Sequence, residues 1–197
     1  MPNATVRDQR DQRDLPDRDD SVLSALRARQ GRVVWLTGLP SAGKSTIARA
    51  LADRLVEAGG PVEILDGDVV RDELGALGFS REHRAEQVRR IAFVADLLTR
   101  NGVDVVCAVI SPYRDARDAV RDRLGDRFVE VWVATPVEVC AERDVKGLYA
   151  KQRRGEITNL TGVDDPYEAP LAPEVVLPTH EQSVDQSVEA VWAALAR

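Results

Sequence analysis

Residues 38–46 read GLPSAGKST, a glycine-rich turn that carries a lysine and two hydroxyl side chains. Gly38, Gly43, Lys44 and Ser45 fit the pattern G-x-x-x-x-G-K-[ST]. Glycines let successive backbone N–H groups turn toward a β-phosphate, and the N-terminus of a following helix adds positive potential. The lysine reaches the β- and γ-phosphates, and the neighbouring hydroxyl is offered to Mg²⁺. The motif therefore predicts a nucleoside triphosphate site, with Ser45 as its metal-binding residue.

A second group of polar residues follows the next apolar run, in LDGDVVRDEL (65–74). A carboxylate here, Asp66 or Asp68, can hold Mg²⁺ through water or accept a proton from an attacking hydroxyl. Arg71 lies three residues after Asp68, so on a helix it would share a face with it and could bind an anionic acceptor. The alternative is an exposed turn with an ordinary ion pair.

Aromatic and basic side chains come together in the next segment, GFSREHRAEQVRR. Phe79 offers a flat ring on which a nucleobase can stack, and Arg84 offers a planar guanidinium for phosphate or sulfate. For Arg89 and Arg90, an anion site and a solvated helix face are equally good interpretations.

An alternation of short apolar runs and longer helical patterns after Gly31 must position these groups. Strands are predicted at 33–37, 62–65, 103–110, 128–133 and 174–177, and helices at about 43–58, 69–75, 82–100, 114–124, 136–142 and 182–196. This β-α order with β-branched strands predicts an α/β fold: a P-loop NTPase three-layer sandwich, in which a parallel five-stranded sheet has helices on both faces. Ligands of such sheets bind at the carboxyl ends of the strands, and the motifs fall there.

Two further features belong to the same edge of the predicted sheet. Ser111 follows the third strand, where it could hydrogen-bond an acceptor or cap the next helix. Residues 144–173 hold three glycines and three prolines and have weak periodicity. A segment of this length between a helix and a strand is a lid, a binding loop or disorder, and its basic stretch and two aromatic residues favour a lid.

The composition narrows the class of protein. The chain has 197 residues, 44% of them hydrophobic, and a net charge of -6, which disfavours nucleic acid and acidic membranes as partners. No signal peptide or membrane span is apparent, so we expect a cytoplasmic protein. Cys107 and Cys140 are expected as buried free thiols. Residues 1–20 carry a DQR repeat and few apolar side chains, so we predict a disordered charged tail before a kinase-like domain at 21–197.

Taken in order, GLPSAGKST, LDGDVVR, GFSREHR, ISPYRDAR and KGLYAKQRRGEITNLTGVDDPYEAP resemble the adenylylsulfate (APS) kinase family, over about residues 32–197. That family transfers the γ-phosphoryl group of ATP to the 3′-hydroxyl of APS, giving 3′-phosphoadenylyl sulfate (PAPS) and ADP in sulfate activation. The resemblance implies ATP and Mg²⁺, APS as the small-molecule substrate, and a homodimer. An alternative from another class, a regulatory or scaffolding protein, would use the charged tail to meet a partner such as an ATP sulfurylase.

The resemblance also assigns roles to individual residues. ATP phosphates are bound by the loop, and ATP also by an arginine before the lid: Gly38, Leu39, Pro40, Ser41, Ala42, Gly43, Lys44, Ser45, Thr46 and Arg143. Positions of the APS site are Asp68, Arg71, Phe79, Arg84, Gln87, Ile110, Ser111, Lys146 and Leu160. The catalytic group comprises Lys44, Asp68 and Ser111. Ser111 matches a serine recorded in the family as a phosphoserine intermediate, but in-line attack needs only positioning and charge neutralisation, with Asp68 receiving the proton, so we expect direct transfer.

Three positions depart from the usual pattern of the family. Val69 stands in place of an asparagine, Gln87 is one methylene longer than the usual asparagine, and Leu160 replaces a lid phenylalanine. Loss of one stacking face costs about 0.5–1.5 kcal/mol of binding. These departures motivate a first alternative, a paralogous kinase of another nucleotide-like anionic acceptor. A second alternative is a nucleotide-binding regulatory protein with weak catalysis.

Overall fold

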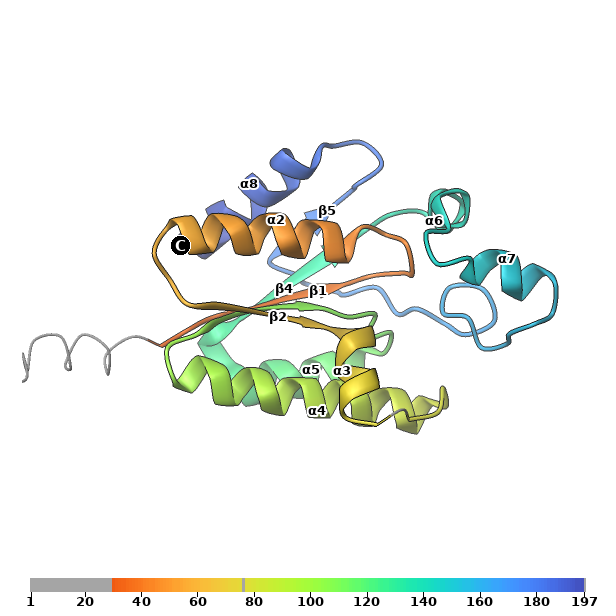
Figure 1. Ribbon diagram of the computed structural model, residues 1–197, viewed down its shortest axis with the longest axis horizontal. Helices are drawn as coiled ribbons and strands as arrows, with labels where there is room; N and C mark the ends of the chain where they lie inside the picture. Colours follow the sequence, from red (N-terminus) through yellow and green to blue (C-terminus); the bar gives the residue numbers. More distant parts are fainter. Residues whose placement is uncertain (1–29, 76, 197) are drawn as a thin grey trace, which may run out of the picture.

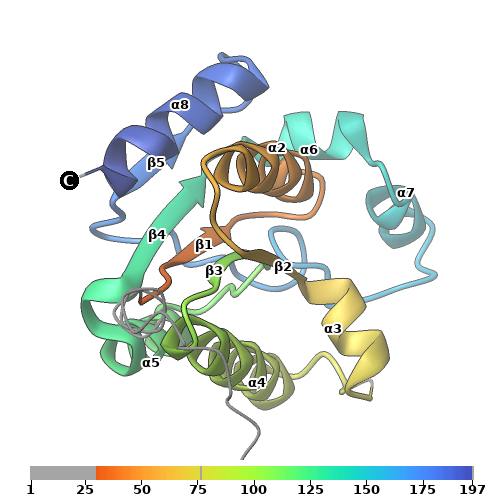
Figure 2. The same ribbon diagram turned by 60° about the vertical axis from the view of Figure 1, so that its left-hand side comes forward.

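The computed structural model describes residues 30–75 and 77–196, so the predicted tail at 1–20 lies outside the described residues. Its centre is a five-stranded parallel sheet with the strand order β2-β3-β1-β4-β5 (Figures 1 and 2). The strands are β1 (Val33–Thr37), β2 (Val62–Asp66), β3 (Asp104–Ala108), β4 (Phe128–Val133) and β5 (Val175–Leu177). The predicted sheet is confirmed; β3 is shorter than expected because the apolar run continues past the sheet into a buried loop.

Helices cover both faces of the sheet, as the alternation of elements predicts (Figures 1 and 2). They are α2 (Lys44–Glu57), α3 (Gly67–Glu73), α4 (Arg81–Arg100), α5 (Arg114–Leu124), α6 (Val137–Arg143), α7 (Leu148–Arg153) and α8 (Val184–Leu195), and a 3₁₀ turn, η1 (Gly125–Arg127), follows α5. α2 and α8 pack on one face, and α4 and α5 pack on the other. Most of the predicted boundaries agree within two residues.

The central strand β1 shows why the apolar runs are unbroken. All five of its side chains are buried. Val34 and Leu36 join the core cluster under α2 and α8, whereas Val33 and Trp35 join the cluster under α4 and α5. A strand buried on both faces carries apolar residues without alternation, which is typical of parallel sheets.

The segment 144–173, here called the lid segment, lies beyond the carboxyl ends of the strands (Figure 1). Four residues after its start it forms the short helix α7, which the weak periodicity did not predict. Its remaining residues run without helix or named strand to β5. The two cysteines are free and buried, as expected. None of the helices in the described ranges is long and apolar enough to cross a membrane.

Leu51 on α2 tests the contribution of the core beneath this helix. Its side chain is fully buried against the sheet. Replacing Leu51 by alanine leaves a cavity, so we expect the free energy of unfolding in urea to fall by about 2–5 kcal/mol. Val56→Ala on the exposed side of the same helix is the matched control and should change it by less than about 0.5 kcal/mol. Equal losses in the two variants would contradict the packing described here.

Candidate active site

The loop between β1 and α2 turns sharply at the carboxyl end of the central strand. Gly38 has φ 155°, and a Cβ there would lie 2.6 Å from the carbonyl oxygen of Val133, so only glycine fits. Gly43, with φ 107°, is the N-cap residue of α2. Lys44 Nζ donates to the carbonyl oxygens of Gly38 at 2.9 Å and Leu39 at 2.7 Å. The Lys44 side chain thus lies across the loop that is predicted to bind the phosphates.

The carbonyl oxygen of Ala42 holds the back of this loop in place. It accepts hydrogen bonds from Thr179 Oγ1 at 2.8 Å, Thr135 Oγ1 at 3.0 Å and Arg143 Nη1 at 3.3 Å. Arg143 Nη2 also donates to the carbonyl oxygen of Thr179 at 2.9 Å. Sequence reasoning missed Thr179, although its place just after β5 is the signal that identified the other motifs.

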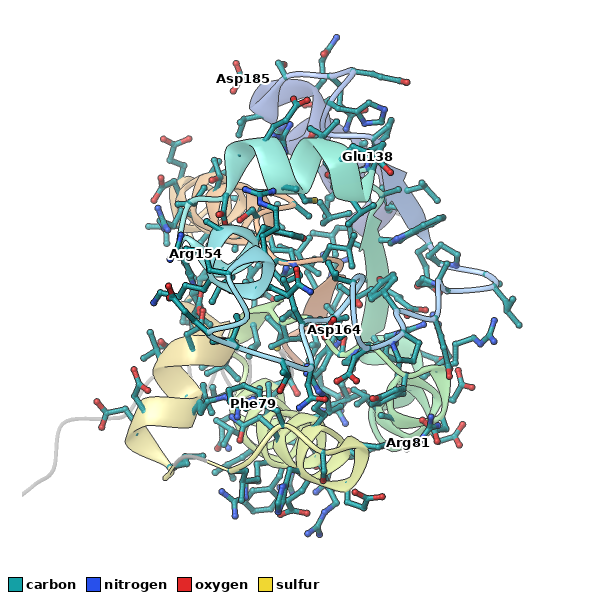
Figure 3. All side chains as sticks on the ribbon, turned by 90° about the vertical axis from the view of Figure 1, so that its right-hand side faces the viewer. Phe79, Arg81, Glu138, Arg154, Asp164 and Asp185 are labelled. Carbon is teal, nitrogen blue, oxygen red and sulfur yellow. The ribbon has the colours of Figure 1, made fainter. Side chains whose placement is uncertain are left out.

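A cavity of about 660 Å³ opens in front of the loop and joins it to the residues predicted for the acceptor. Of the predicted site residues, its lining includes Pro40, Ser41, Gly43, Lys44, Ser45, Thr46, Asp68, Arg71, Arg84, Gln87, Ile110, Ser111, Arg143 and Lys146. Figure 3 looks onto this edge of the molecule, which the lid segment crosses. Donor and acceptor residues from five separate motifs therefore share one space.

The other five predicted residues lie outside the lining. Gly38, Leu39 and Ala42 shape the loop from behind. Phe79, labelled in Figure 3, is 57% exposed, and the Arg71 guanidinium lies 4.8 Å from its ring centroid. Leu160 is buried in the core cluster under α2. Contacts of Phe79 and Leu160 with a nucleotide stay predictions.

Ser45 and Asp66 meet where α2 and β2 come together. Ser45 Oγ donates to Asp66 Oδ2 at 2.7 Å, while the other carboxylate oxygen accepts from the backbone N–H of Asp68 at 3.0 Å and caps α3. Hydroxyl and carboxylate oxygens are ligands that Mg²⁺ prefers, and the ion usually takes one or two of them together with phosphates and water. This donor set fits Mg²⁺. No cluster of three or more histidine, cysteine or acidic side chains suited to a metal occurs within 30–75 and 77–196.

Asp68 and Lys146 form an ion pair that joins α3 to the lid segment. Both side chains are more than half exposed. An exposed pair of this kind contributes at most about 1 kcal/mol. A charged ligand can therefore replace it at little cost.

Arg84 on α4 is buried, and its donors bind the lid segment and the start of the helix. They reach the carbonyl oxygens of Asn159 at 2.6 Å and Phe79 at 2.9 Å, Thr161 Oγ1 at 2.8 Å and Asp165 Oδ2 at 3.1 Å. Arg84 thus lines the cavity and also fixes the turn at 159–165. Arg89 and Arg90 instead pair with Glu86 on their own helix, which favours the solvated-face interpretation for them.

Gln87, one turn further along α4, is the unusual polar residue of the cavity. It is 5% exposed, and neither its amide oxygen nor its amide nitrogen has a hydrogen-bond partner among the described residues. A buried amide without partners costs free energy unless a ligand or water satisfies it. Gln87 also belongs to the lining of the cavity.

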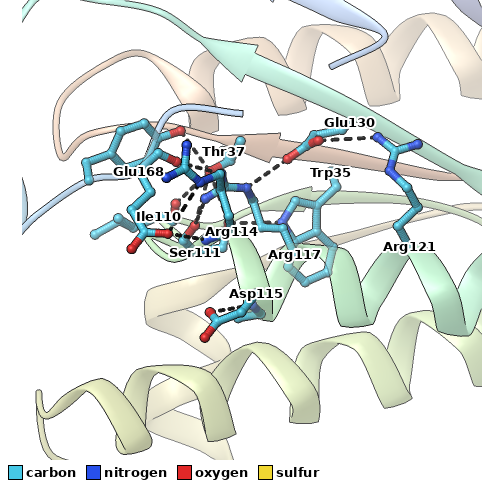
Figure 4. Close-up of polar contacts among 12 residues, drawn as sticks. Trp35, Thr37, Ile110, Ser111, Arg114, Asp115, Arg117, Arg121, Glu130 and Glu168 are labelled. Atoms are coloured by element: carbon cyan, nitrogen blue, oxygen red, sulfur yellow. Dashed lines mark hydrogen bonds and ion pairs between the residues drawn. The ribbon is translucent and has the colours of Figure 1, made fainter. Parts of the chain in front are cut away.

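Ser111 is held in a strained conformation at the end of β3. Its φ of 38° is rare for a residue other than glycine. The buried hydroxyl accepts from Trp35 Nε1 at 3.0 Å and donates to Thr37 Oγ1 at 3.1 Å (Figure 4). Both hydrogen-bonding functions of this hydroxyl are therefore engaged by the protein.

Comparison with known proteins agrees with this geometry. The model of the adenylylsulphate kinase family matches residues 30–178. The chain belongs to the adenylylsulphate kinase family. An adenylyl-sulfate kinase of Rippkaea orientalis is 56% identical over 168 residues, which is 85% of this chain and 92% of that protein.

Solved structures of the family are also similar. The APS kinase of Mycobacterium tuberculosis in complex with AMPPNP and APS has a TM-score of 0.82 and 42% identity, covering 86% of this chain and 99% of that chain. A hexameric APS kinase from Thiobacillus denitrificans has a TM-score of 0.65 and 37% identity, covering 89% of this chain and 31% of that longer chain.

The charge of Lys44 depends on pH within the working range of an enzyme. Burial lowers the pKa of the Lys44 ammonium from 10.5 to about 8, against the opposing pull of the Asp66 and Asp68 carboxylates. At pH 9 about one tenth of the free protein would keep this charge. Because a triphosphate favours the ammonium form, binding ATP takes up a proton above pH 8.

We therefore predict that the Kd for ATP rises about tenfold between pH 7.5 and pH 9. Titration calorimetry in two buffers of different ionisation enthalpy would measure both the affinity and the proton uptake. Lys44→Arg is the control, because its side chain stays charged throughout, and its Kd should not change over this range. A wild-type Kd that stays constant from pH 7.5 to 9 would refute the lowered pKa.

Proposed function

We propose a division of labour by which this chain carries out the reaction of its family, the transfer of the γ-phosphoryl group of ATP to the 3′-hydroxyl of APS. The observation that carries the proposal is the single cavity that joins the phosphate loop to Asp68, Gln87 and Ile110. A paralogous kinase with another acceptor is not favoured, since relatives at 56% identity over most of the chain are adenylyl-sulfate kinases.

The donor is bound by the loop 38–46 and by the N-terminus of α2. Lys44 is placed to exchange its two carbonyl contacts for the β- and γ-phosphate oxygens. Arg143, which lies at the cavity and holds Ala42 and Thr179, supports the nucleotide end of the site. Ser45 and Asp66 would hold Mg²⁺, which when bound neutralises charge on the phosphates.

The acceptor lies against the opposite wall. The 3′-oxygen of APS attacks the γ-phosphorus, the bond to the ADP oxygen breaks, and Asp68 receives the proton of the hydroxyl. Lys146, which pairs with Asp68 in the free protein, then becomes available to the anionic substrate. Arg71 adds a further positive charge to this wall of the cavity.

The Ser111 hydroxyl is already engaged by the protein. Trp35 Nε1 occupies one of its two lone pairs and its proton is donated to Thr37 Oγ1, so a serine nucleophile would have to give up the Thr37 contact when it loses its proton. This supports direct in-line transfer, in which the protein supplies position and charge. A homodimer, an ATP sulfurylase partner and a cytoplasmic location stay predictions.

The deciding experiment incubates the protein with Mg-ATP and APS and follows ADP and PAPS by chromatography. We expect stoichiometric ADP and PAPS from the wild type, and loss of at least about 100-fold in kcat for Lys44→Ala, because the charge that stabilises the transferring group is removed. Circular dichroism checks that the variant is folded. ADP formed only with another nucleotide acceptor would support the paralogue, and ATP binding without turnover would support a regulatory protein.

Gln87 provides a separate test of the acceptor wall. Replacing Gln87 by leucine removes both amide atoms at nearly constant size, so we expect KM for APS to rise about 10- to 100-fold while KM for ATP stays within twofold. Gln87→Asn, which keeps the amide, should stay within about fivefold of the wild type. Arg89→Gln, on the exposed side of the same helix, is the control. An unchanged KM for APS in Gln87→Leu would remove this residue from the site.

A further inference from the structure

Arg117 on α5 is among the largest fully buried side chains of the described chain, yet it does not line the cavity. Its guanidinium is 2% exposed as a side chain and has three hydrogen-bond partners (Figure 4). Nε donates to Glu130 Oε1 at 2.8 Å, Nη1 to the carbonyl oxygen of Ser111 at 2.6 Å, and Nη2 to that of Glu168 at 2.6 Å. One planar group therefore joins the sheet, the acceptor wall and the lid segment.

Glu130 gives this arrangement its fixed point. It belongs to β4, inside the sheet, and is buried. Its second carboxylate oxygen accepts from Arg121 Nη2 at 3.2 Å, and its backbone N–H donates to Glu174 at 2.6 Å. Because the Glu130 carboxylate belongs to the sheet and not to a loop, it fixes the Arg117 guanidinium, which in turn binds the Ser111 loop and the lid segment.

The Ser111 contact stabilises a conformation that the backbone would not adopt alone. A positive φ in a serine costs free energy and persists only where its surroundings hold it. The hydroxyl is held by Trp35 and Thr37, and the carbonyl oxygen by Arg117. Ser111 and Ile110 are thereby fixed as a wall of the cavity.

The Glu168 contact fixes the C-terminal end of the lid segment. The Glu168 backbone N–H donates to the carbonyl oxygen of Pro112 at 2.8 Å, and the hydroxyls of Tyr167 and Thr37 lie 3.0 Å apart. Asp165, three residues earlier, is the lid residue that pairs with Arg84 in the cavity lining. The position of the lid over the acceptor therefore depends on the place where Arg117 fixes its end.

A role in stability alone is a weaker explanation of this arrangement. A buried ion pair often contributes little net stability, since the cost of desolvating both charges offsets their attraction. Two of the three bonds go to loop carbonyl oxygens rather than to Glu130. A rigid guanidinium fork suits several fixed acceptors at once, which a lysine cannot satisfy in the same way.

We propose that Arg117 is a positioning residue for the acceptor: it sets the Ser111 wall and the end of the lid segment at the spacing that APS requires. This proposal rests on the proposed function, because the role of Arg117 is measured through the kinetic constants for APS. Arg117 itself does not contact substrate.

The test replaces Arg117 by lysine, which keeps a positive charge beside Glu130 but loses the fork. We expect KM for APS to rise at least tenfold and kcat to fall, while the Kd for ATP stays within twofold of the wild type. Arg121→Lys is the matched control: it lies one turn along the same helix and pairs with the same carboxylate, but is bonded to neither Ser111 nor Glu168. It should retain wild-type constants for both ligands.

Tyr167→Phe keeps the experiment decisive if Arg117→Lys does not fold. It removes one hydroxyl between the lid segment and Thr37 and leaves the ion pair intact. KM for APS should rise by a smaller factor, again with unchanged ATP binding. The proposal is overturned if folded Arg117→Lys has wild-type KM and kcat, if its APS and ATP affinities fall together, or if Arg121→Lys behaves identically. A wild-type protein that forms no PAPS would instead refute the proposed function.

Discussion

Hydrogen bonds from helix arginines to loop carbonyl oxygens hold the active edge of this protein together. Parallel strands all end at one edge, so the loops that leave them carry polar backbone groups that no strand partner satisfies. Arg143 binds the Thr179 carbonyl beside the phosphate loop, Arg84 binds that of Asn159 in the lid segment, and Arg117 binds that of Ser111 in the acceptor wall. Each arginine comes from a helix that the core already fixes, so the rigid part of the molecule determines the shape of the cavity.

The groups expected to meet substrate are held much less firmly than these supports. Lys44 rests on two carbonyl oxygens, Lys146 is in an exposed pair with Asp68, and the Gln87 amide has no partner among the described residues. Replacing such contacts costs little free energy, and a ligand that hydrogen-bonds an unsatisfied amide lowers the free energy of the complex. The loop backbone is thus held by several hydrogen bonds, while the charged side chains have contacts that a ligand can replace, and in-line phosphoryl transfer needs this combination of fixed position and available charge.

Local patterns were good predictors where the relevant physics is local. The order of strands and helices follows from unbroken β-branched runs and from helical periodicity. The run of β1 is unbroken because this strand is buried on both faces. The phosphate loop follows from residues that are adjacent in the chain, and Gly38 can have no side chain because Val133 lies against it. The helix α7 was not predicted, because its six residues are too short for a periodic pattern.

The sequence by itself determined the fold class, the phosphate loop and the family, since each depends on residue types at short spacing. Only the tertiary structure decided which predicted residues reach the cavity: Leu160 packs into the core, whereas Gln87 is placed in the lining with its amide unpartnered. It also revealed Arg117, whose partners lie 6, 13 and 51 residues away. Contacts at such separations depend on how the sheet brings distant loops together at one edge, and no local spacing encodes that.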